Sequence, residues 1–346
     1  MRKVFARIVL LVCLGVLVLS SSERTMHWLA NIRYGDTSLL GSDKYRFGDL
    51  YGLTYLAPYR IQTDTSLIRN QAKFQQKRDI ELTILGDSYL FSFMKFDTTN
   101  FARAKEVTFR WWAEQNLEPL TVQKTTNKKV LLIETVERNV WTVLTKDRLK
   151  VHLEHVSPNL SWHESMNALL FDLMYHPYLE QNVDFTLFNV QLFSPLKSLK
   201  AYINQRWFNR STPGVSISKD REFLYIEETM DSTLRSSSFY PIKKDEVHEI
   251  SERMLAMNQY AKSKGFDEVI FVIIPNPVVI TKTEKRPTNE LIRKLSLDLG
   301  GKVRILDPTD TLMKGGKKYF FKSDSHWNQD GARTWLAQFN QNLLKL

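Results

Sequence analysis

Predominantly apolar runs of strand length recur along the chain, and most of them end at turn-forming residues. The four clearest runs are residues 80–85, 129–135, 268–274 and 303–306. Mainly apolar runs of this length are typical of strands that are buried on both faces. The pattern therefore predicts at least four strands of one covered sheet.

A helical repeat precedes the third of these runs. Its apolar positions alternate at spacings of three and four residues, at Val247, Ile250, Met254, Met257 and Ala261. This spacing places them on one face of an α-helix, and Gly265 supplies a left-handed end. We also expect helices from Ser88 to about residue 95, over 136–144, and from about residue 328. Helices that alternate with buried strands predict an α/β domain with a parallel sheet covered on both faces.

The first 22 residues have the pattern of a targeting segment. Met1-Arg2-Lys3 and Arg7 are followed by an unbroken apolar stretch over 8–19 and then by three serines. A basic start, a short apolar middle and small residues at the end are typical of a secretory signal or an uncleaved membrane anchor. We therefore expect the rest of the chain to lie outside the cytoplasmic membrane, in the periplasm or at the cell surface.

The remainder divides into an arm and one large domain. Residues 23–79 show no clear helical or strand period, and we interpret them as an extended arm wrapped on the main domain. Residues 80–346 carry the strand and helix patterns. Within them, residues from about 150 to 240 break the alternation and are rich in aromatic and turn-forming residues, so we expect an insertion there that serves as a lid or substrate platform.

Composition excludes some classes of function. The chain of 346 residues has a formal charge of +10, which fits anionic lipid headgroups or an acidic polymer, although a solvated basic surface is the simpler interpretation. No nucleic-acid-binding motif is present, and we expect no nucleic-acid partner. Cys13 is the only cysteine and lies in the targeting segment, which excludes disulfides and thiol chemistry in the body.

Two short motifs far apart in the sequence carry candidate chemistry. Gly86-Asp87-Ser88 follows the first apolar run, and Asp324-Ser325-His326-Trp327 lies near the C-terminus. A serine hydroxyl is a weak nucleophile until an imidazole takes its proton, and the imidazole needs a carboxylate to fix its tautomer. Ser88, His326 and Asp324 supply these three groups if the fold brings them together. This chemistry requires no cofactor and no metal, and we expect neither.

These motifs resemble those of a known superfamily. Gly86-Asp87-Ser88 after a strand, together with the block from Lys322 to Asn328 and Gly331-Ala332, is similar to the SGNH (GDSL) hydrolases. More narrowly, it resembles the branch that contains alginate O-acetyltransferase-like proteins. Supporting matches are the sequences after the second and third apolar runs, at residues 133–138 and 274–277. The resemblance covers roughly residues 80–346.

The resemblance implies a fold, a site and a class of reaction. The fold is a three-layer α/β/α flavodoxin-like SGNH domain with a parallel central sheet, and the triad is Ser88, Asp324 and His326. Members of this branch move acetyl groups onto or off hydroxyls of exported polysaccharides. Ordinary SGNH esterases have Asp-x-x-His, whereas this chain has Asp-x-His, which favours the acetyltransferase-like branch. In the alginate proteins, however, the Asp-x-His-Trp motif precedes the serine.

Further residues are candidates for binding the oxyanion or the substrate. Arg138 and Asn139 follow the second apolar run, where the superfamily's asparagine block would fall, and Trp327 is placed to wall an acetyl pocket or to stack on a sugar. The alternatives are that Arg138 forms a structural ion pair with Glu134, and that Trp327 is a core residue. Asp87 is expected to bond local backbone N–H groups and not to act as a catalytic acid.

Two further interpretations remain open. A cluster of imidazoles and a carboxylate is a rival zinc site, although its spacing fits no helical ligand pattern; it consists of His152, Glu154, His155 and His163. The function classes are an acetyltransferase for an exported polysaccharide, which would receive acetyl groups from a multi-pass membrane acyltransferase, a carbohydrate acetylesterase, and a non-catalytic glycan-binding module.

Overall fold

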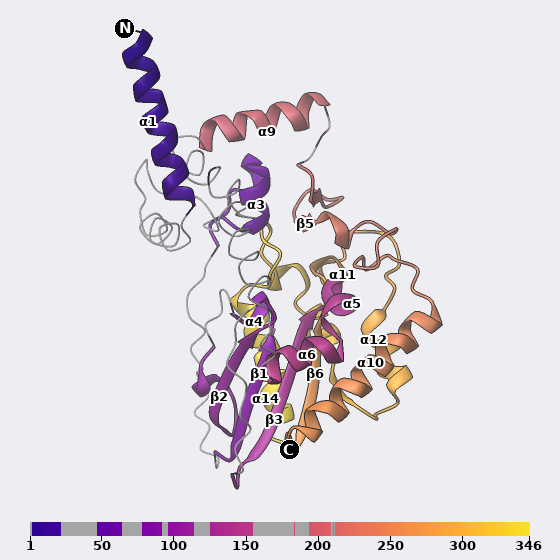
Figure 1. Cartoon of the computed structure of the whole chain (residues 1–346). Coiled ribbons are helices and arrows are strands. Elements are labelled where there is room, and N and C mark those ends of the chain that lie inside the picture. The colour runs from indigo at the N-terminus through magenta and orange to yellow at the C-terminus, as the bar shows by residue number, and fades with distance from the viewer. Residues whose placement is uncertain are drawn as a thin grey trace. The chain divides into compact units, whose positions relative to one another are not determined.

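A computed structural model of the chain describes residues 2–21, 47–63, 78–91, 96–113, 125–154, 183, 194–208, 210 and 212–346. The chain forms two compact units, coloured by residue number in Figure 1. One unit comprises Met1–Gln62 and Ser157–Thr212, and the other comprises Thr63–Val156 and Pro213–Leu346. The second unit contains the sheet and both candidate motifs.

The centre of the second unit is a five-stranded sheet in the order β2-β1-β3-β6-β7, and every neighbouring pair is parallel. The strands are β1 (Ile80–Gly86), β2 (Ala104–Trp111), β3 (Lys128–Val136), β6 (Glu268–Ile274) and β7 (Arg304–Leu306). The α/β class and the parallel sheet expected from the apolar runs are confirmed. In the sheet, β1 has its chain successor β2 on one side and β3 on the other, as Figure 1 shows.

The four predicted strands are present to within one residue at each end, whereas β2 was not predicted. This strand lies at an edge of the sheet, and most of its residues are exposed or only half-buried. Edge strands tolerate charged side chains, and Lys105, Glu106 and Arg110 mask the apolar pattern by which the inner strands were recognised.

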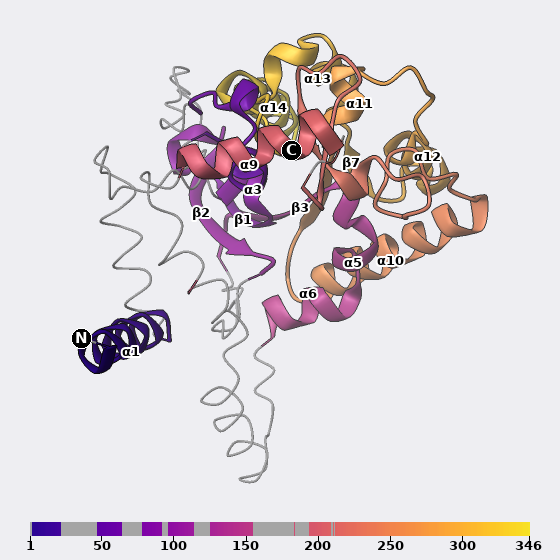
Figure 2. The same ribbon diagram turned by 90° about the horizontal axis from the view of Figure 1, so that it is seen from above.

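Helices cover both faces of the sheet. On one face, Leu82, Leu132 and Val272 belong to the same buried cluster as Trp335 and Phe339 of α14 (Gln329–Leu343). The other face packs on α10 (Lys244–Ser263) and α12 (Leu291–Leu299), and also on α5 (Val140–Val143) and α6 (Lys146–Leu153). Figure 2 shows α14 and α10 on opposite sides of the strands. Burial of each large apolar side chain in these layers contributes about 1.5–3 kcal/mol.

The predicted helix before β6 is confirmed as α10. Its five apolar positions, from Val247 to Ala261, are all buried, and Gly265 has a φ of 99° after the helix ends. Positive φ is a conformation that glycine adopts without strain. The chain then enters β6 directly, so this helix, turn and strand form the connection that the sequence pattern predicted.

Short elements complete the second unit. They are α4 (Ser88–Phe91), α11 (Pro277–Thr281), α13 (Thr309–Met313), the 3-10 helices η2 (Thr98–Asn100), η3 (Glu137–Asn139), η5 (Glu227–Thr229) and η6 (Gly316–Tyr319), and the antiparallel hairpin of β4 (Val215–Ile217) and β5 (Leu224–Ile226). The helix expected from Ser88 is described as far as Phe91. The helix expected over 136–144 forms as η3 followed by α5.

The first unit contains α1 (Arg2–Ser20), α3 (Asp49–Thr54), the 3-10 helix η1 (Ala57–Tyr59) and α9 (Ser194–Phe208). At 19 residues, α1 is long and apolar enough to cross a membrane, as a signal anchor or a span. Of the expected arm, residues 47–63 contain α3 and η1, and residues 23–46 and 64–77 lie outside the described residues. Of the expected insertion, residues 157–212 group with the first unit, whereas residues 150–156 and 213–240 group with the second. The insertion's role as a lid or platform stays a prediction.

Candidate active site

Ser88 is the first residue of α4, immediately after the carboxyl end of β1. Because β1 lies between β2 and β3, the chain leaves β1 toward β2 on one side and leaves β3 toward β6 on the other side of the sheet. Open parallel sheets bind their ligands in the crevice at such a point. The topology therefore places the candidate nucleophile where a ligand site is expected.

Asp87 holds the turn that carries Ser88. Its Oδ1 accepts a hydrogen bond from the backbone N–H of Tyr89 at 2.9 Å, and its Oδ2 accepts one from the N–H of Val136 at 3.0 Å. The first bond closes the turn and the second ties it to the end of β3. The expectation that Asp87 bonds backbone N–H groups is confirmed.

A second carboxyl group lies directly beneath this turn. Glu134 is fully buried on β3, and its Oε2 accepts a hydrogen bond from the backbone N–H of Asp87 at 2.8 Å. Burial, and then the nearby carboxylate of Asp87, raise the pKa of Glu134 well above its ordinary value. The main cause of this pKa shift is that a charged carboxylate loses its hydration when it is buried.

The late motif folds into a tight turn that brings its own carboxylate to its imidazole. Asp324 Oδ1 accepts hydrogen bonds from the backbone N–H of His326, at 2.9 Å, and from its ring Nδ1, at 2.7 Å. A short aspartate side chain reaches the N–H two residues ahead in an Asx turn. The Asp-x-His spacing thus produces the carboxylate–imidazole pair locally, before any contact with Ser88.

The two motifs meet at the carboxyl end of β1. His326 Nε2 lies 2.8 Å from the hydroxyl oxygen of Ser88, although the residues are 238 apart in sequence. With Nδ1 protonated and bonded to Asp324, Nε2 is able to accept the serine proton, which is the arrangement of a serine–histidine–aspartate triad. Asp324 and His326 are buried and Ser88 is half-buried. The structure brings together the three residues proposed from the sequence.

The start of α14 positions His326. The side chain of Asn328 caps this helix by accepting hydrogen bonds from the N–H groups of Asp330 and Gly331, at 3.0 and 3.1 Å. At Gly331, a Cβ atom would come within 2.5 Å of the carbonyl oxygen of Tyr319. Only glycine permits this close approach, which explains the Asn-x-x-Gly pattern that follows His-Trp.

Tyr89 joins the two motifs on their buried side. Its hydroxyl donates a hydrogen bond to the carbonyl oxygen of Ser325 at 2.5 Å, and its ring lies 4.9 Å from that of His326, centre to centre. Sequence reasoning did not select Tyr89. The one feature in the sequence that could have indicated a role for Tyr89 was its position next to Ser88, because Ser325, which its hydroxyl contacts, lies 236 residues away.

Trp327 is a core residue, and this corrects its candidacy for the substrate. It is 0% exposed, its Nε1 donates a hydrogen bond to the carbonyl oxygen of Tyr89 at 3.2 Å, and its ring packs against Tyr89 and Trp335. A side chain without accessible surface cannot stack on a sugar ring. The alternative of a structural tryptophan therefore holds.

Arg138 lies near the triad. Its guanidinium carbon is 6.0 Å from the ring centre of Tyr89, and its buried Nη1 has no hydrogen-bond partner among the described residues. Within the part of the chain that the structure describes, Arg138 forms no ion pair with Glu134. The Oε2 of Glu134 instead accepts a hydrogen bond from the backbone N–H of Asp87. Asn139 follows as the N-cap of α5, without capping it through its side chain. The oxyanion role of both residues stays a prediction.

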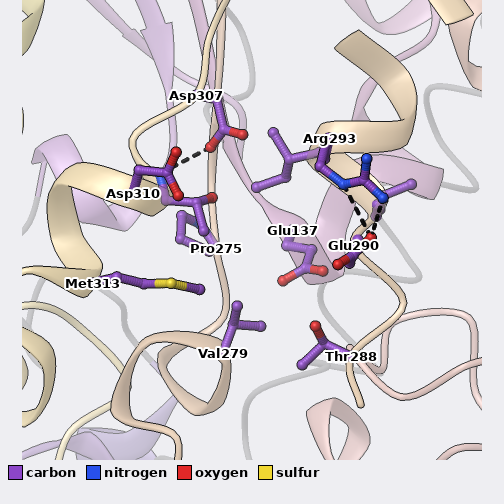
Figure 3. Close-up of a pocket in the computed structure, with 12 residues that line it drawn as sticks. Glu137, Pro275, Val279, Thr288, Glu290, Arg293, Asp307, Asp310 and Met313 are labelled. Carbon is purple, nitrogen blue, oxygen red and sulfur yellow. Dashed lines mark hydrogen bonds and ion pairs between the residues drawn. The ribbon is translucent and has the colours of Figure 1, made fainter. Parts of the chain in front are cut away.

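A pocket of about 200 Å³ opens on the same edge of the sheet, at the ends of β6 and β7. Figure 3 shows the carboxylate of Glu137 pointing into it. Glu137 is buried, accepts hydrogen bonds from the N–H of Asn276 at 3.0 Å and from the hydroxyl of Ser238 at 3.1 Å, and has a pKa that burial raises to about 7. The sequence analysis named Glu134 as the alternative ion-pair partner of Arg138 and did not select Glu137, although both glutamates lie at the end of an otherwise apolar run.

The rival zinc cluster is described only in part. His152 is buried with its ring against Trp112, at 5.3 Å between ring centres, and Glu154 forms an ion pair with Lys264. His155 and His163 lie outside the described residues. Both described members thus have structural partners.

Comparisons of the chain with protein-family models, with curated proteins and with solved structures found no match. The function of the protein is therefore inferred from the site itself and from the motifs that form it.

Proposed function

We propose that the protein is a serine-dependent O-acetyltransferase that acts outside the cytoplasmic membrane on a cell-surface or secreted polysaccharide. The observation that carries this proposal is the hydrogen-bonded chain from Ser88 through His326 to Asp324, with distances of 2.8 and 2.7 Å. A non-catalytic glycan-binding module has no need of this arrangement.

The first half of the reaction loads the serine. His326 Nε2 takes the proton of Ser88 while the serine oxygen forms a bond to the carbonyl carbon of an acetyl donor. The tetrahedral intermediate collapses when the bond to the donor's leaving group breaks, and the protonated imidazole gives its proton to that group. Asp324 stabilises the positive charge of the imidazole in both steps. The product is an acetyl ester on Ser88.

The second half of the reaction transfers the acetyl group from Ser88 to the acceptor. His326 takes the proton of a sugar hydroxyl, whose oxygen attacks the acetyl carbon, and Ser88 regains its proton as leaving group. During both halves, negative charge develops on the carbonyl oxygen. We propose that the backbone N–H of Ser88 stabilises it, with help from Arg138 or Asn139; each such donor contributes on the order of 3 kcal/mol in known acyl-transfer sites.

Two features favour assignment to the SGNH superfamily over assignment to another class of serine-dependent enzyme. Numbered along the chain, the strand order of the sheet is 2-1-3-4-5, which is the flavodoxin-like order with its ligand site between the first and third strands. The Asp-x-His-Trp block resembles the acetyltransferase-like branch, and its parts have structural roles here: Asp324 and His326 in the triad, Trp327 in the core and Gly331 at the start of α14.

The proposed partners follow from location. If α1 is a retained anchor, the enzyme works at the outer surface of the membrane, where acetyl groups must be supplied from the cytoplasm. A multi-pass membrane acyltransferase is the class of protein that we propose as donor. The proposed acceptor is an exported polysaccharide.

The test is to replace Ser88 by alanine in the full chain and to measure labelling by a fluorophosphonate probe and turnover of p-nitrophenyl acetate. We expect both to be lost. Ser263→Ala, at an exposed serine of α10, is the matched control and should keep both. Labelling and turnover of Ser88→Ala at the control level would overturn the serine mechanism.

A second measurement follows the acetyl group. With an acetylated donor and an oligosaccharide acceptor, we expect the label to appear on the oligosaccharide. Release of acetate alone, with the acceptor unmodified, would instead identify a carbohydrate acetylesterase, because water and sugar hydroxyls attack the same intermediate.

A further inference from the structure

The helix α9, in the first unit, presents large apolar side chains to solvent. Leu196 is 63% exposed, Leu199 is 55% exposed and Trp207 is 74% exposed. Tyr202 and Phe208 are also exposed. A helix on the surface of a soluble protein has its apolar residues turned inward, and contiguous exposed apolar surface marks an interaction site.

Leu196, Leu199 and Trp207 share one face of the helix. Leu199 follows Leu196 by three residues, and Trp207 follows Leu196 by eleven, which is close to three full turns. The amino group of Lys197 lies 4.6 Å from the ring centre of Tyr55, in the same unit. The helix is therefore oriented with this apolar face outward. Several polar positions of the helix are instead half-buried: Lys197, Ser198, Asn204 and Gln205.

The charged side chains of α9 itself are all basic. Residues 194–208 contain no acidic side chain, and Lys200 and Arg206 are exposed beside Leu199 and Trp207. Arg210, two residues after the helix, is exposed as well. Apolar and aromatic side chains with flanking lysine and arginine are the composition of helices that lie in the interface of an anionic bilayer, where long basic side chains reach the headgroups.

We propose that the exposed face of α9 binds the surface of an anionic phospholipid membrane. The same unit contains α1, the helix long and apolar enough to cross a membrane, so a membrane is the surface most available to this unit. A single apolar segment fixes only the point of attachment, whereas a second contact through α9 also fixes the orientation of the unit on the bilayer. This inference does not depend on the proposed enzymatic function.

The experiment uses the full chain in nanodiscs that contain phosphatidylcholine and phosphatidylglycerol. Cys13 is replaced by serine, and a single cysteine is introduced by Leu199→Cys or, as a second site, by Trp207→Cys; each is labelled with an NBD fluorophore. We expect blue-shifted emission and quenching by nitroxides attached to the lipid chains. The matched control is Leu297→Cys on α12, because Leu297 is 68% exposed in the other unit, and it should show neither effect.

The contribution of charge is tested in the same assay. The double variant Lys200→Glu, Arg206→Glu should lower the quenched fraction severalfold, because each basic residue near an anionic surface changes binding by roughly fivefold. Labels at 199 and 207 as water-exposed as the label at 297 would overturn the proposal. Blue-shifted emission that rises with protein concentration in lipid-free buffer would also overturn it, since it would identify a second copy of the chain as the occupant.

Discussion

The backbone N–H of Asp87 donates a hydrogen bond to the buried carboxyl of Glu134, with 2.8 Å between the nitrogen and Oε2. The bond joins the residue before Ser88 to the neighbouring strand β3, 47 positions later in the chain. Together with the bond from the Val136 N–H to Asp87, it fixes the turn at two points. The position of the serine hydroxyl therefore depends on a carboxyl group that lies buried beneath the turn.

Substitution of Glu134 tests this positioning role. Glu134→Gln keeps an oxygen acceptor for the Asp87 N–H and should leave kcat within a few-fold of the wild type. Glu134→Ala leaves that N–H buried without a partner, at a cost of about 1–3 kcal/mol in the free energy of unfolding, and should lower kcat about tenfold or more. Urea denaturation and acetyl-ester turnover measure the two effects. Equal loss of activity in both variants would contradict the role, because the acceptor would then be irrelevant.

The contact between Asp324 and His326 predicts a large and specific kinetic effect. Asp324→Asn should lower kcat about 10⁴-fold, since an amide cannot hold the required tautomer or stabilise the imidazolium. Ser325→Ala is the matched control, because the Ser325 hydroxyl lies 3.3 Å from the same Nδ1 that Asp324 contacts at 2.7 Å. Its turnover should stay close to that of the wild type. A comparable loss in both variants would show that Asp324 is not the partner that matters.

Gly331 should not tolerate a methyl group. Gly331→Ala places a Cβ atom within 2.5 Å of the Tyr319 carbonyl oxygen and 2.9 Å of the Trp327 Cβ. Forced separation of these groups should lower stability by about 1–3 kcal/mol and displace His326 from Ser88. The comparison is Gly52→Ala on α3, where a Cβ meets nothing within 4 Å, and this change should stabilise the helix by about 0.5–1 kcal/mol. Calorimetric melting of both variants gives the result, and an unchanged melting temperature for Gly331→Ala would exclude the steric role.

Glu137 predicts a pH-dependent stability. An exposed glutamate has a pKa of 4.5, whereas burial raises the pKa of Glu137 to about 7 in the folded protein. Between these values the folded state binds more protons than the unfolded state, so the free energy of unfolding falls as pH rises through this window. The total loss is on the order of 3 kcal/mol, at about 1.36 kcal/mol per pKa unit.

Glu137→Gln keeps an acceptor for Asn276 and Ser238 without a titratable group. The difference in unfolding free energy between about pH 5 and about pH 8, measured in urea, should therefore shrink in this variant. Glu228→Gln, at an exposed glutamate of η5, should leave that difference as it is in the wild type. The same pH dependence in Glu137→Gln and in the wild type would assign the effect to another group.

The sequence alone was sufficient for the elements whose physics is local. Inner strands such as β1 and β6 are mainly apolar because helices cover both faces, and α10 has a continuous buried stripe. The Asp-x-His turn is local as well, since Asp324 bonds a backbone N–H only two residues away. These features need no knowledge of the rest of the chain.

Only the tertiary structure decided what lies together. The edge strand β2 owes its place to pairing with β1 and not to an apolar pattern, and its charged residues hid it. The contact of Ser88 with His326 joins residues 238 positions apart, and the bond from Asp87 to Glu134 joins residues 47 positions apart. The burial of Trp327 depends on the side chains that pack around it. The spacing of apolar residues along the chain indicates whether a segment is a helix or a strand, whereas the packing of sheets and helices decides which side chains meet. For this reason the sequence was enough to name the three triad residues, but only the fold shows that they lie together.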